Sequence, residues 1–390
     1  MSTARDPEPS GPRSEGFDRT MSATAGVLFS YALGTLSVLV PLIAVRAGYR
    51  PAEIGLLVAV AALAQIGTRL GMGALMRSFP DKWFLIGSVL MIAGSCILMA
   101  LSHLLWVLII AQLLQGASRA LFFTSSQTHA VRTAPSAVNG LRNINLAIGV
   151  GALLGPAVAG YLWEFSAHLP LVLGAAGSAL AVIPLTLLTK FPPFAAKTSI
   201  GEHRGTRLWR RSGVQTACWM NVSAGGWKSV LDSYIPVALS LAGQSAAVIG
   251  VLVSIANAAV LLGSAAGGWI HSKGIKPSLV VGVLTTGVGL AAAGPLAPLA
   301  VAAAAALALS GIGAGILQTV GPAIAAEHVH PEERGDALAL TGTYRAVALF
   351  VAPFGMAGLV TLAPVAVAVV TAGLLITAPA AAGWRPKRTT

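Results

Sequence analysis

Charged residues are scarce in this chain, which has 25 Lys and Arg but only 13 Asp and Glu among its 390 residues. Charged residues make up 10% of the sequence and hydrophobic residues 55%, and the mean hydropathy is +0.79. An ordinary soluble domain carries roughly 25% charged residues. Almost no long stretch is polar enough to face water, which excludes a soluble globular protein and indicates one that crosses a membrane several times.

Cysteine and the common catalytic signatures are also missing or nearly so. The two cysteines, Cys96 and Cys218, fall within predicted helices, and we interpret them as small apolar packing residues without a disulfide. No G-x-x-x-x-G-K-[ST] loop is present, which argues against ATP-driven transport, and neither G-x-S-x-G nor H-E-x-x-H occurs. The seven histidines are scattered near loops or helix ends. We therefore expect no enzyme, no metal and no cofactor.

The basic residues lie mainly on one side of the predicted membrane. A net charge of +12 could suit a nucleic-acid-binding protein, but these residues sit in the tails and in alternate short loops. Eighteen fall on the side that holds both termini, and only Arg46 and Arg50 fall on the other. Positive charge marks the cytoplasmic side. We expect no nucleic-acid partner and a multi-pass plasma-membrane protein with both termini in the cytoplasm.

Hydrophobic runs of spanning length predict twelve transmembrane helices in two bundles of six. The first bundle, 22–189, contains helices at 22–45, 53–76, 83–102, 104–128, 140–163 and 168–189. The second, 213–383, contains helices at 213–240, 247–270, 277–295, 298–325, 336–361 and 363–383. The remaining segments are a disordered cytoplasmic N-terminus at 1–21, a basic cytoplasmic linker at 190–212 and a cytoplasmic tail at 384–390. We interpret the first span as a retained helix and not a cleaved signal peptide.

The second half of the sequence repeats the first at an offset of 195 residues. The matching positions are mostly glycine and proline, which set close backbone approach or a bend. Pro41, Gly48, Ala52, Ile54 and Gly55 recur as Pro236, Gly243, Ala247, Ile249 and Gly250, while Gly73, Gly87, Gly116 and Gly140 recur as Gly268, Gly282, Gly311 and Gly335. Many secondary transporters are built from two homologous helical halves. The repeat predicts an all-α membrane protein with two pseudo-symmetric bundles.

Three local motifs carry a family resemblance. They are the turn from Gly48 to Gly55 with its repeat from Gly243 to Gly250, the segment from His330 to Ala337, and the run Gly151-Ala-Leu-Leu-Gly155-Pro156-Ala-Val-Ala-Gly160. Together with the twelve helices, they resemble the major facilitator superfamily over roughly residues 22–383. The last run is similar to the family's motif C, typical of proton-coupled antiporters, with Ala159 in place of one glycine. Ordinary tight packing of an Ala/Gly-rich helix is the alternative interpretation.

Two other motifs depart from the family pattern. The loop between helices 2 and 3 normally places an acid four residues after a glycine, but here Gly73 is followed by Arg77, with Asp81 nearby as a candidate substitute. Helix 4 carries its arginine at Arg119, after Gln115-Gly116 and not before it. We assign conformational or gating roles to Gly73, Arg77, Asp81, Gly151, Gly155, Pro156, Gly160 and Pro236.

Charges inside the predicted spans are the candidate functional residues. A charge at a helix centre costs roughly 2.5–3.5 kcal/mol on an insertion scale, so it must be paired, hydrated or able to reach an interface. Five basic residues are embedded, Arg69, Arg119, Arg142, Lys228 and Arg345, against one deep acid, Asp232. Arg142 lies where it can reach the cytoplasmic interface. Arg69 has structural and functional interpretations of equal weight.

Lys228 and Asp232 stand four residues apart on one helix face, so they predict either an intrahelical ion pair or a proton-coupling site. The resemblance implies that helices 1, 4, 7 and 10 line a central cavity, which makes the excess of cations a receptor for a substrate anion. Arg345 has an alternative role in holding backbone carbonyls or a tyrosine. The substrate-binding candidates are Arg119, Lys228, Arg345, Gln115, Trp227, Tyr234, Asn257, Gln318 and Tyr344. The amides among them have a bridging alternative and the aromatics an interfacial one.

These features predict a secondary transporter that alternates access to a central site. We expect proton-coupled antiport, exporting a small organic molecule that is anionic or neutral, by a protein that functions as a monomer in the lipid bilayer. Uptake by symport or uniport is the alternative within the same fold. A non-transporting membrane sensor is a further alternative, although the sequence shows no added soluble domain of the kind that sensors carry.

Overall fold

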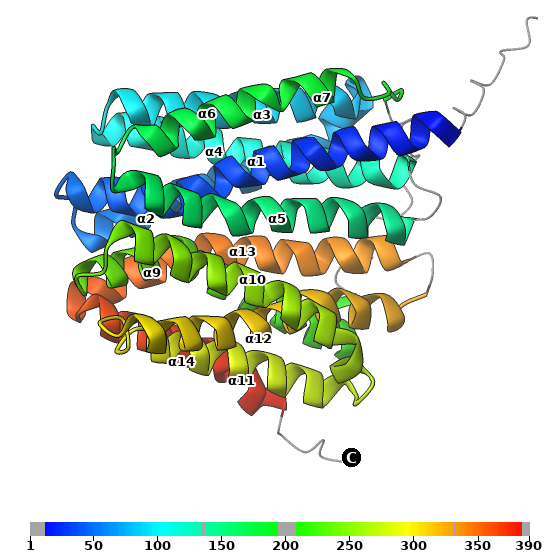
Figure 1. The fold of residues 1–390 in the computed structure, drawn as a ribbon. Coiled ribbons are helices and arrows are strands. Elements are labelled where there is room, and N and C mark those ends of the chain that lie inside the picture. The colour runs from blue at the N-terminus through cyan, green and yellow to red at the C-terminus, as the bar shows by residue number, and fades with distance from the viewer. Residues whose placement is uncertain (1–11, 134–136, 194–207, 331–332, 384–390) are drawn as a thin grey trace, which may run out of the picture.

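The computed structural model describes residues 12–133, 137–193, 208–330 and 333–383, and this part of the chain forms thirteen helices (Figure 1). The first half contains α1 (Pro12–Arg46), α2 (Pro51–Ser78), α3 (Asp81–Leu101), α4 (Leu105–Thr133), α5 (Ala137–Trp163), α6 (Leu169–Leu180) and α7 (Val182–Thr186). The second contains α9 (Ser212–Leu241), α10 (Ala246–His271), α11 (Ile275–Ala293), α12 (Ala300–Glu327), α13 (Arg334–Leu362) and α14 (Val365–Gly383).

These helices make the twelve predicted crossings. Ten segments of the described chain are long and apolar enough to span a membrane, and α6 and α7 together form one of them. The break between α6 and α7 falls three residues before Pro184, whose missing N–H removes one helical hydrogen bond. The remaining two crossings are α9, which is less hydrophobic because it carries Lys228 and Asp232, and the shorter apolar α14.

The N-terminus differs most from the sequence-based limits. Residues 12–21, which we expected to be disordered, form the first turns of α1, while residues 1–11 lie outside the described part. Pro12 suits a first helical position because its missing N–H needs no partner there. Asp18 then fixes this end of α1, since its carboxylate accepts the N–H of Thr189 at 3.1 and 3.2 Å. The tail 384–390 and linker residues 194–207 are outside the described residues as well.

The 195-residue repeat is visible in the geometry of its glycines. Gly48 and Gly243 follow the first helix of each half with φ of 83° and 84°, a left-handed conformation that favours glycine. A Cβ added at Gly116 would collide with the carbonyl oxygen of Ala61, and one at Gly311 would collide with that of Ala256. Ala61 and Ala256 are themselves 195 residues apart, so the same backbone contact between two helices occurs in both halves.

The halves meet mainly along two seams, α5 against α10 and α2 against α13, and α9 also packs against α1 and α2. In Figure 1, α3 and α6 lie at one edge of the molecule and α11 and α14 at the other, with α5, α10 and α13 between them. We call the end that holds Asp18, Arg132 and Arg211 the basic end, and the end that holds Arg46 and Glu164 the opposite end. The seams bring the middle of α4, α9 and α13 toward the centre of the molecule.

The seam between α5 and α10 is tightest toward the opposite end. A Cβ at Gly160 would meet the Ala246 carbonyl, and one at Gly250 would meet the Pro156 carbonyl, so the two backbones are in direct contact. The Glu164 carboxylate also accepts the N–H of Ala247 at 3.1 Å across this seam. Glycine allows this approach because it has no side chain. The structure is therefore closed at the opposite end.

Candidate functional site

An ion pair in the middle of α9 forms the core of the candidate site. The ammonium of Lys228 donates to Asp232 Oδ1 at 2.8 Å and to Asn257 Oδ1 of α10 at 3.3 Å. The Lys228 side chain is 28% exposed and that of Asp232 only 9%. Because the two residues are one helical turn apart, α9 itself sets their geometry. The lysine reaches accessible space while the acid is largely enclosed.

Arg119 of α4 brings a second cation toward the same acid from the other half of the molecule. The charge of Asp232 acts on Arg119 across the space between α9 and α4. Within the described residues, Arg119 Nε is buried and has no hydrogen-bond partner. A buried donor without a partner is costly. Asp232 is therefore paired with Lys228 and within electrostatic range of Arg119, and the arginine retains unused hydrogen-bonding capacity.

Arg345 and Gln318 form a second polar contact in this region. The Arg345 guanidinium donates to Gln318 Oε1 at 3.2 Å, which links α13 to α12. Arg69 of α2, in the other half, is close enough for its charge to repel that of Arg345. Arg345 is partly buried and Arg69 is exposed. The pair places two like charges on the two sides of the α2–α13 seam, where a bound anion would relieve their repulsion.

Four other predicted substrate contacts have partners of their own. Gln115 is buried and donates to Ser95 Oγ of α3 at 3.0 Å, and Trp227 is buried and donates to Ser310 Oγ of α12 at 3.0 Å. The ring of Tyr344 stacks on Trp209, with centroids 4.7 Å apart. Tyr234 is fully buried against α2. These contacts hold helices together. Among the predicted site residues, the structure joins Lys228, Asp232 and Asn257 directly, has Arg119 within electrostatic range of Asp232, and joins Arg345 and Gln318 as a separate pair.

The motif C glycines contact α1 of their own half. A Cβ at Gly151 would collide with Ser30 and Val27, and one at Gly155 would collide with Tyr31, so α1 and α5 touch backbone to backbone. Gly160, one turn beyond Pro156, contacts α10 instead. The motif therefore joins α5 both to its own bundle and to the second half.

The remaining gating candidates are distributed along the helices. Pro236 is buried within α9, one turn from Asp232, and Arg77 is exposed in the last turn of α2. Gly73 lies within α2, but its surroundings are not described, and neither is the side chain of Arg142. Asp81, the candidate substitute for the family's acid, contacts residues of its own half.

A buried cluster at the basic end of the first half was missed by sequence reasoning. His129 of α4 is fully buried, with Nδ1 3.4 Å from Asp81 Oδ2 and Nε2 3.9 Å from Asp18 Oδ2. Arg132 Nη1 lies 3.8 Å from the same Asp81 oxygen. The cluster joins α1, α3 and α4, and the described residues include no group of three ligands arranged to hold a metal. The sequence did contain a signal for this cluster, namely a histidine at the end of one predicted span and acidic residues near the ends of two others.

The fold and the embedded charges together define a class, the membrane transporters built from two six-helix halves. The sequence model of the Major Facilitator Superfamily matches residues 22–353. The chain therefore belongs to the Major Facilitator Superfamily, and it is a membrane transporter and not an enzyme.

Solved structures of transporters have the same fold. A mutant of the nucleoside transporter NupG superposes with a TM-score of 0.79 at 14% identity, covering 94% of this chain and 100% of that one. A bacterial homolog of the human lysosomal transporter Spinster, inward-facing and unoccupied, gives 0.77 at 13% identity, with 96% and 97% covered. A POT family transporter in complex with a thioalcohol-conjugated peptide gives 0.75 at 13% identity, with 94% and 95% covered. No curated protein sequence matches this chain.

Proposed function

We propose that this transporter is a proton-coupled antiporter that exports a small organic molecule, anionic or neutral, across the plasma membrane. One observation supports this proposal above all. Asp232 is the only carboxylate near the middle of the spanning helices within the described residues, and it pairs with Lys228 and lies within electrostatic range of Arg119. An embedded ionisable residue of this kind is the default candidate for carrying a proton.

The pair offers a direct way to exchange a proton for a substrate. When Asp232 is ionised, it neutralises Lys228 and the site has little affinity for another anion. When Asp232 takes up a proton, Lys228 and Arg119 are released to bind a carboxylate, phosphate or phenolate. Asn257 already accepts from Lys228 at 3.3 Å, so it can keep the ammonium in place when the acid is neutral. Proton and substrate are then linked through one lysine.

Alternating access supplies the movement in this proposal. The opposite end is closed by the Gly160–Ala246 and Gly250–Pro156 backbone contacts, so the resting form would open toward the basic end. We propose that the basic end faces the cytoplasm, because basic residues mark that side. One chain contains both halves and the complete set of central residues, which supports a monomer as the functional unit.

The embedded charges favour anions over cationic drugs. Lys228, Arg119 and Arg345 outnumber the one central acid, so an unoccupied site carries excess positive charge. The fold neighbours include a nucleoside transporter and a POT family transporter in complex with 5-aminolevulinic acid. Those structures share the fold at 14% and 13% identity, and they suggest small polar organic molecules as the first compounds to test.

The test is transport by the purified protein in proteoliposomes with an imposed pH gradient. The probes are an aromatic carboxylate, a nucleoside and a lipophilic quaternary cation. We expect uptake of the carboxylate or the nucleoside to depend on the gradient in the wild type and to lose that dependence in Asp232→Asn, while counterflow continues. Glu327→Gln, which changes an exposed carboxylate at the basic end, is the matched control.

Four outcomes would each contradict a part of the proposal. Full proton-driven transport by Asp232→Asn would show that the acid is not the coupling residue. Transport in the direction of the proton gradient would indicate symport, and transport indifferent to pH would indicate a uniporter. Preference for the quaternary cation would refute the anion preference on its own and leave proton antiport intact.

A further inference from the structure

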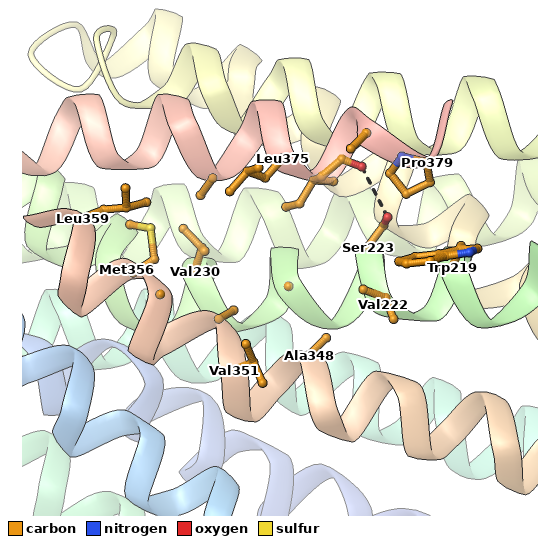
Figure 2. Close-up of a pocket in the computed structure, with 16 residues that line it drawn as sticks. Trp219, Val222, Ser223, Val230, Ala348, Val351, Met356, Leu359, Leu375 and Pro379 are labelled. Atoms are coloured by element: carbon orange, nitrogen blue, oxygen red, sulfur yellow. Dashed lines mark hydrogen bonds between the residues drawn. The ribbon is translucent and has the colours of Figure 1, made fainter. Parts of the chain in front are cut away.

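The second half of the molecule contains an apolar groove. It lies between α9, α13 and α14, has a volume of about 530 Å³, and is shown in Figure 2. Val351 is 54% exposed at its edge and Leu375 is 64% exposed. Because these residues lie on membrane-spanning helices and α14 is at the edge of the molecule, the groove opens toward the lipid.

The repeat explains why the groove exists. In the first half, the ring of Tyr31 on α1 lies 3.7 Å from where a Cβ of Gly177 on α6 would be, so tyrosine occupies the space between these helices. The residues 195 positions later are Gly226 and Ala372, and both line the groove. Because Gly226 has no side chain, the second half has a hollow at the place that the Tyr31 ring fills in the first half. The groove is therefore a specific departure from the internal symmetry.

The lining of the groove suits a hydrocarbon. The one hydroxyl among the lining residues belongs to Ser223, and it already donates to the carbonyl of Ile376 at 3.3 Å (Figure 2). Aliphatic side chains such as Val230, Met356 and Leu359 make up most of the rest. The indole N–H of Trp219 lies at one end of the lining, and away from it a ligand with polar atoms would lose hydrogen bonds to water without replacing them on these side chains. The enclosed part of any ligand must be apolar.

The groove is long enough to hold a stretch of acyl chain. The lining runs from Trp219 to Val230 on α9, eleven residue steps and so about 16 Å. Carbon atoms in contact are about 3.5–4 Å apart, so a volume of about 530 Å³ leaves room for one extended methylene chain along this length. A second copy of the chain is the competing occupant, and native mass spectrometry distinguishes the two.

We propose that the α9–α13–α14 groove binds one acyl chain of a membrane phospholipid. The groove runs along the middle of α9 and α14, at the depth of the hydrocarbon core, where acyl chains surround the protein. The occupied groove completes the packing that Tyr31 provides in the first half. This site is independent of the central charges, so it stands or fails separately from the proposed transport activity.

Photolabelling of the full-length protein tests the proposal. The protein is reconstituted in vesicles of phosphatidylethanolamine and phosphatidylglycerol containing a phosphatidylcholine with a diazirine in its acyl chain. We expect peptides covering 219–230 and 348–359 to be labelled more strongly than the lipid-exposed α3. Gly226→Tyr should lower that labelling about tenfold, the change in occupancy that about 1.4 kcal/mol produces.

A control variant makes the comparison specific. Gly268 lies in open space on the exposed side of α10, which does not line the groove, so Gly268→Tyr should leave groove labelling unchanged. Gly355→Leu is the second groove-filling variant if Gly226→Tyr fails to fold, because Gly355 lines the groove with no atom within 4 Å of its Cβ position. Groove labelling equal to that of α3, or unaffected by a folded groove-filling variant, would overturn the proposal. Loss of a dimer in native mass spectrometry on filling the groove would also overturn it, in favour of a second copy of the chain.

Discussion

Tyr234 of α9 lies directly against Gly55 of α2, so that any side chain at residue 55 would overlap the tyrosine ring. The contact crosses from one half to the other near the opposite end, and Tyr234 is fully buried there. Closure at this end therefore depends on the ring of Tyr234 in the second half and on the absence of a side chain at Gly55 in the first.

Gly55→Val should prevent this closure. The added side chain would occupy the position of the tyrosine ring and favour forms that are open at the opposite end. We expect transport to fall about tenfold, equivalent to about 1.4 kcal/mol. A cysteine introduced at Ser240 should react faster with a membrane-impermeant maleimide. Gly67→Val, in the same helix with nothing within 4 Å of its Cβ position, is the control, and equal effects of both variants would contradict the prediction.

Tyr234→Phe should leave the protein as stable as the wild type or make it more stable. The hydroxyl of Tyr234 is buried and has no hydrogen-bond partner within the described residues. Removing a buried polar group that lacks a partner ends a desolvation cost of about 1–3 kcal/mol. Thermal unfolding in detergent measures the change. A fall in stability of similar size would mean that the hydroxyl has a partner in the membrane-embedded protein.

Gly116→Leu and Gly311→Leu should destabilise the protein by similar amounts. Each side chain would collide with a carbonyl of the neighbouring helix, that of Ala61 or Ala256. Overpacking of this kind costs about 1–3 kcal/mol. Gly268→Leu, at a position with nothing within 4 Å, should be close to neutral in the same unfolding experiment. A strong effect at only one of the two repeated glycines would show that the matching contacts do not contribute equally.

His129→Leu should destabilise the basic end of the first half. The imidazole lies between the carboxylates of Asp18 and Asp81, and removing it leaves two buried acids near each other. Leaving a buried polar group without its neighbour costs about 1–3 kcal/mol. Asp81→Asn in the same protein should recover part of the loss, so the double mutant tests the coupling. Strictly additive effects in unfolding experiments would show that the residues do not interact.

The Arg211–Glu333 pair should give a small pH-dependent contribution to stability. Hydrogen bonds from the Arg211 guanidinium, the nearer at 2.8 Å, lower the pKa of Glu333 below its ordinary value near 4.5. A carboxylate with a lowered folded-state pKa stabilises the protein above its unfolded pKa and loses this effect as pH falls through the folded value. Wild type should therefore be slightly more stable than Glu333→Gln at pH 7, and the difference should shrink as pH falls from about 4.5 through the lower folded-state pKa of Glu333. A stability difference that does not change with pH would refute the assignment.

Sequence reasoning predicted the fold well because the bilayer imposes a length and a composition on every crossing. Most helix limits lie within a few residues of the observed ones, and α9 was found despite Lys228 and Asp232 because its flanks are apolar. The start of α1 was predicted ten residues late. The residues after Pro12 are polar and resemble a disordered segment, and the sequence does not show that Asp18 accepts a hydrogen bond from Thr189, far along the chain.

The site was only partly predictable. Lys228 and Asp232 were identified because an embedded charge needs a partner, and four-residue spacing puts that partner on the same helix face. Gln115 and Trp227 could not be separated from true lining residues, since a polar side chain in a span does not reveal which neighbouring helix it faces. Here they bond to Ser95 and Ser310 within their own halves.

The contact between α5 and α10 is made by peptide groups, since Gly160 and Gly250 have no side chains to withdraw. No change of rotamer and no proton can release such a contact. The two helices must move apart as rigid rods, and every close approach along the seam must separate in the same step. The opposite end would then open in one cooperative step. A change elsewhere in the molecule that tilts one half against the other would be enough to cause it.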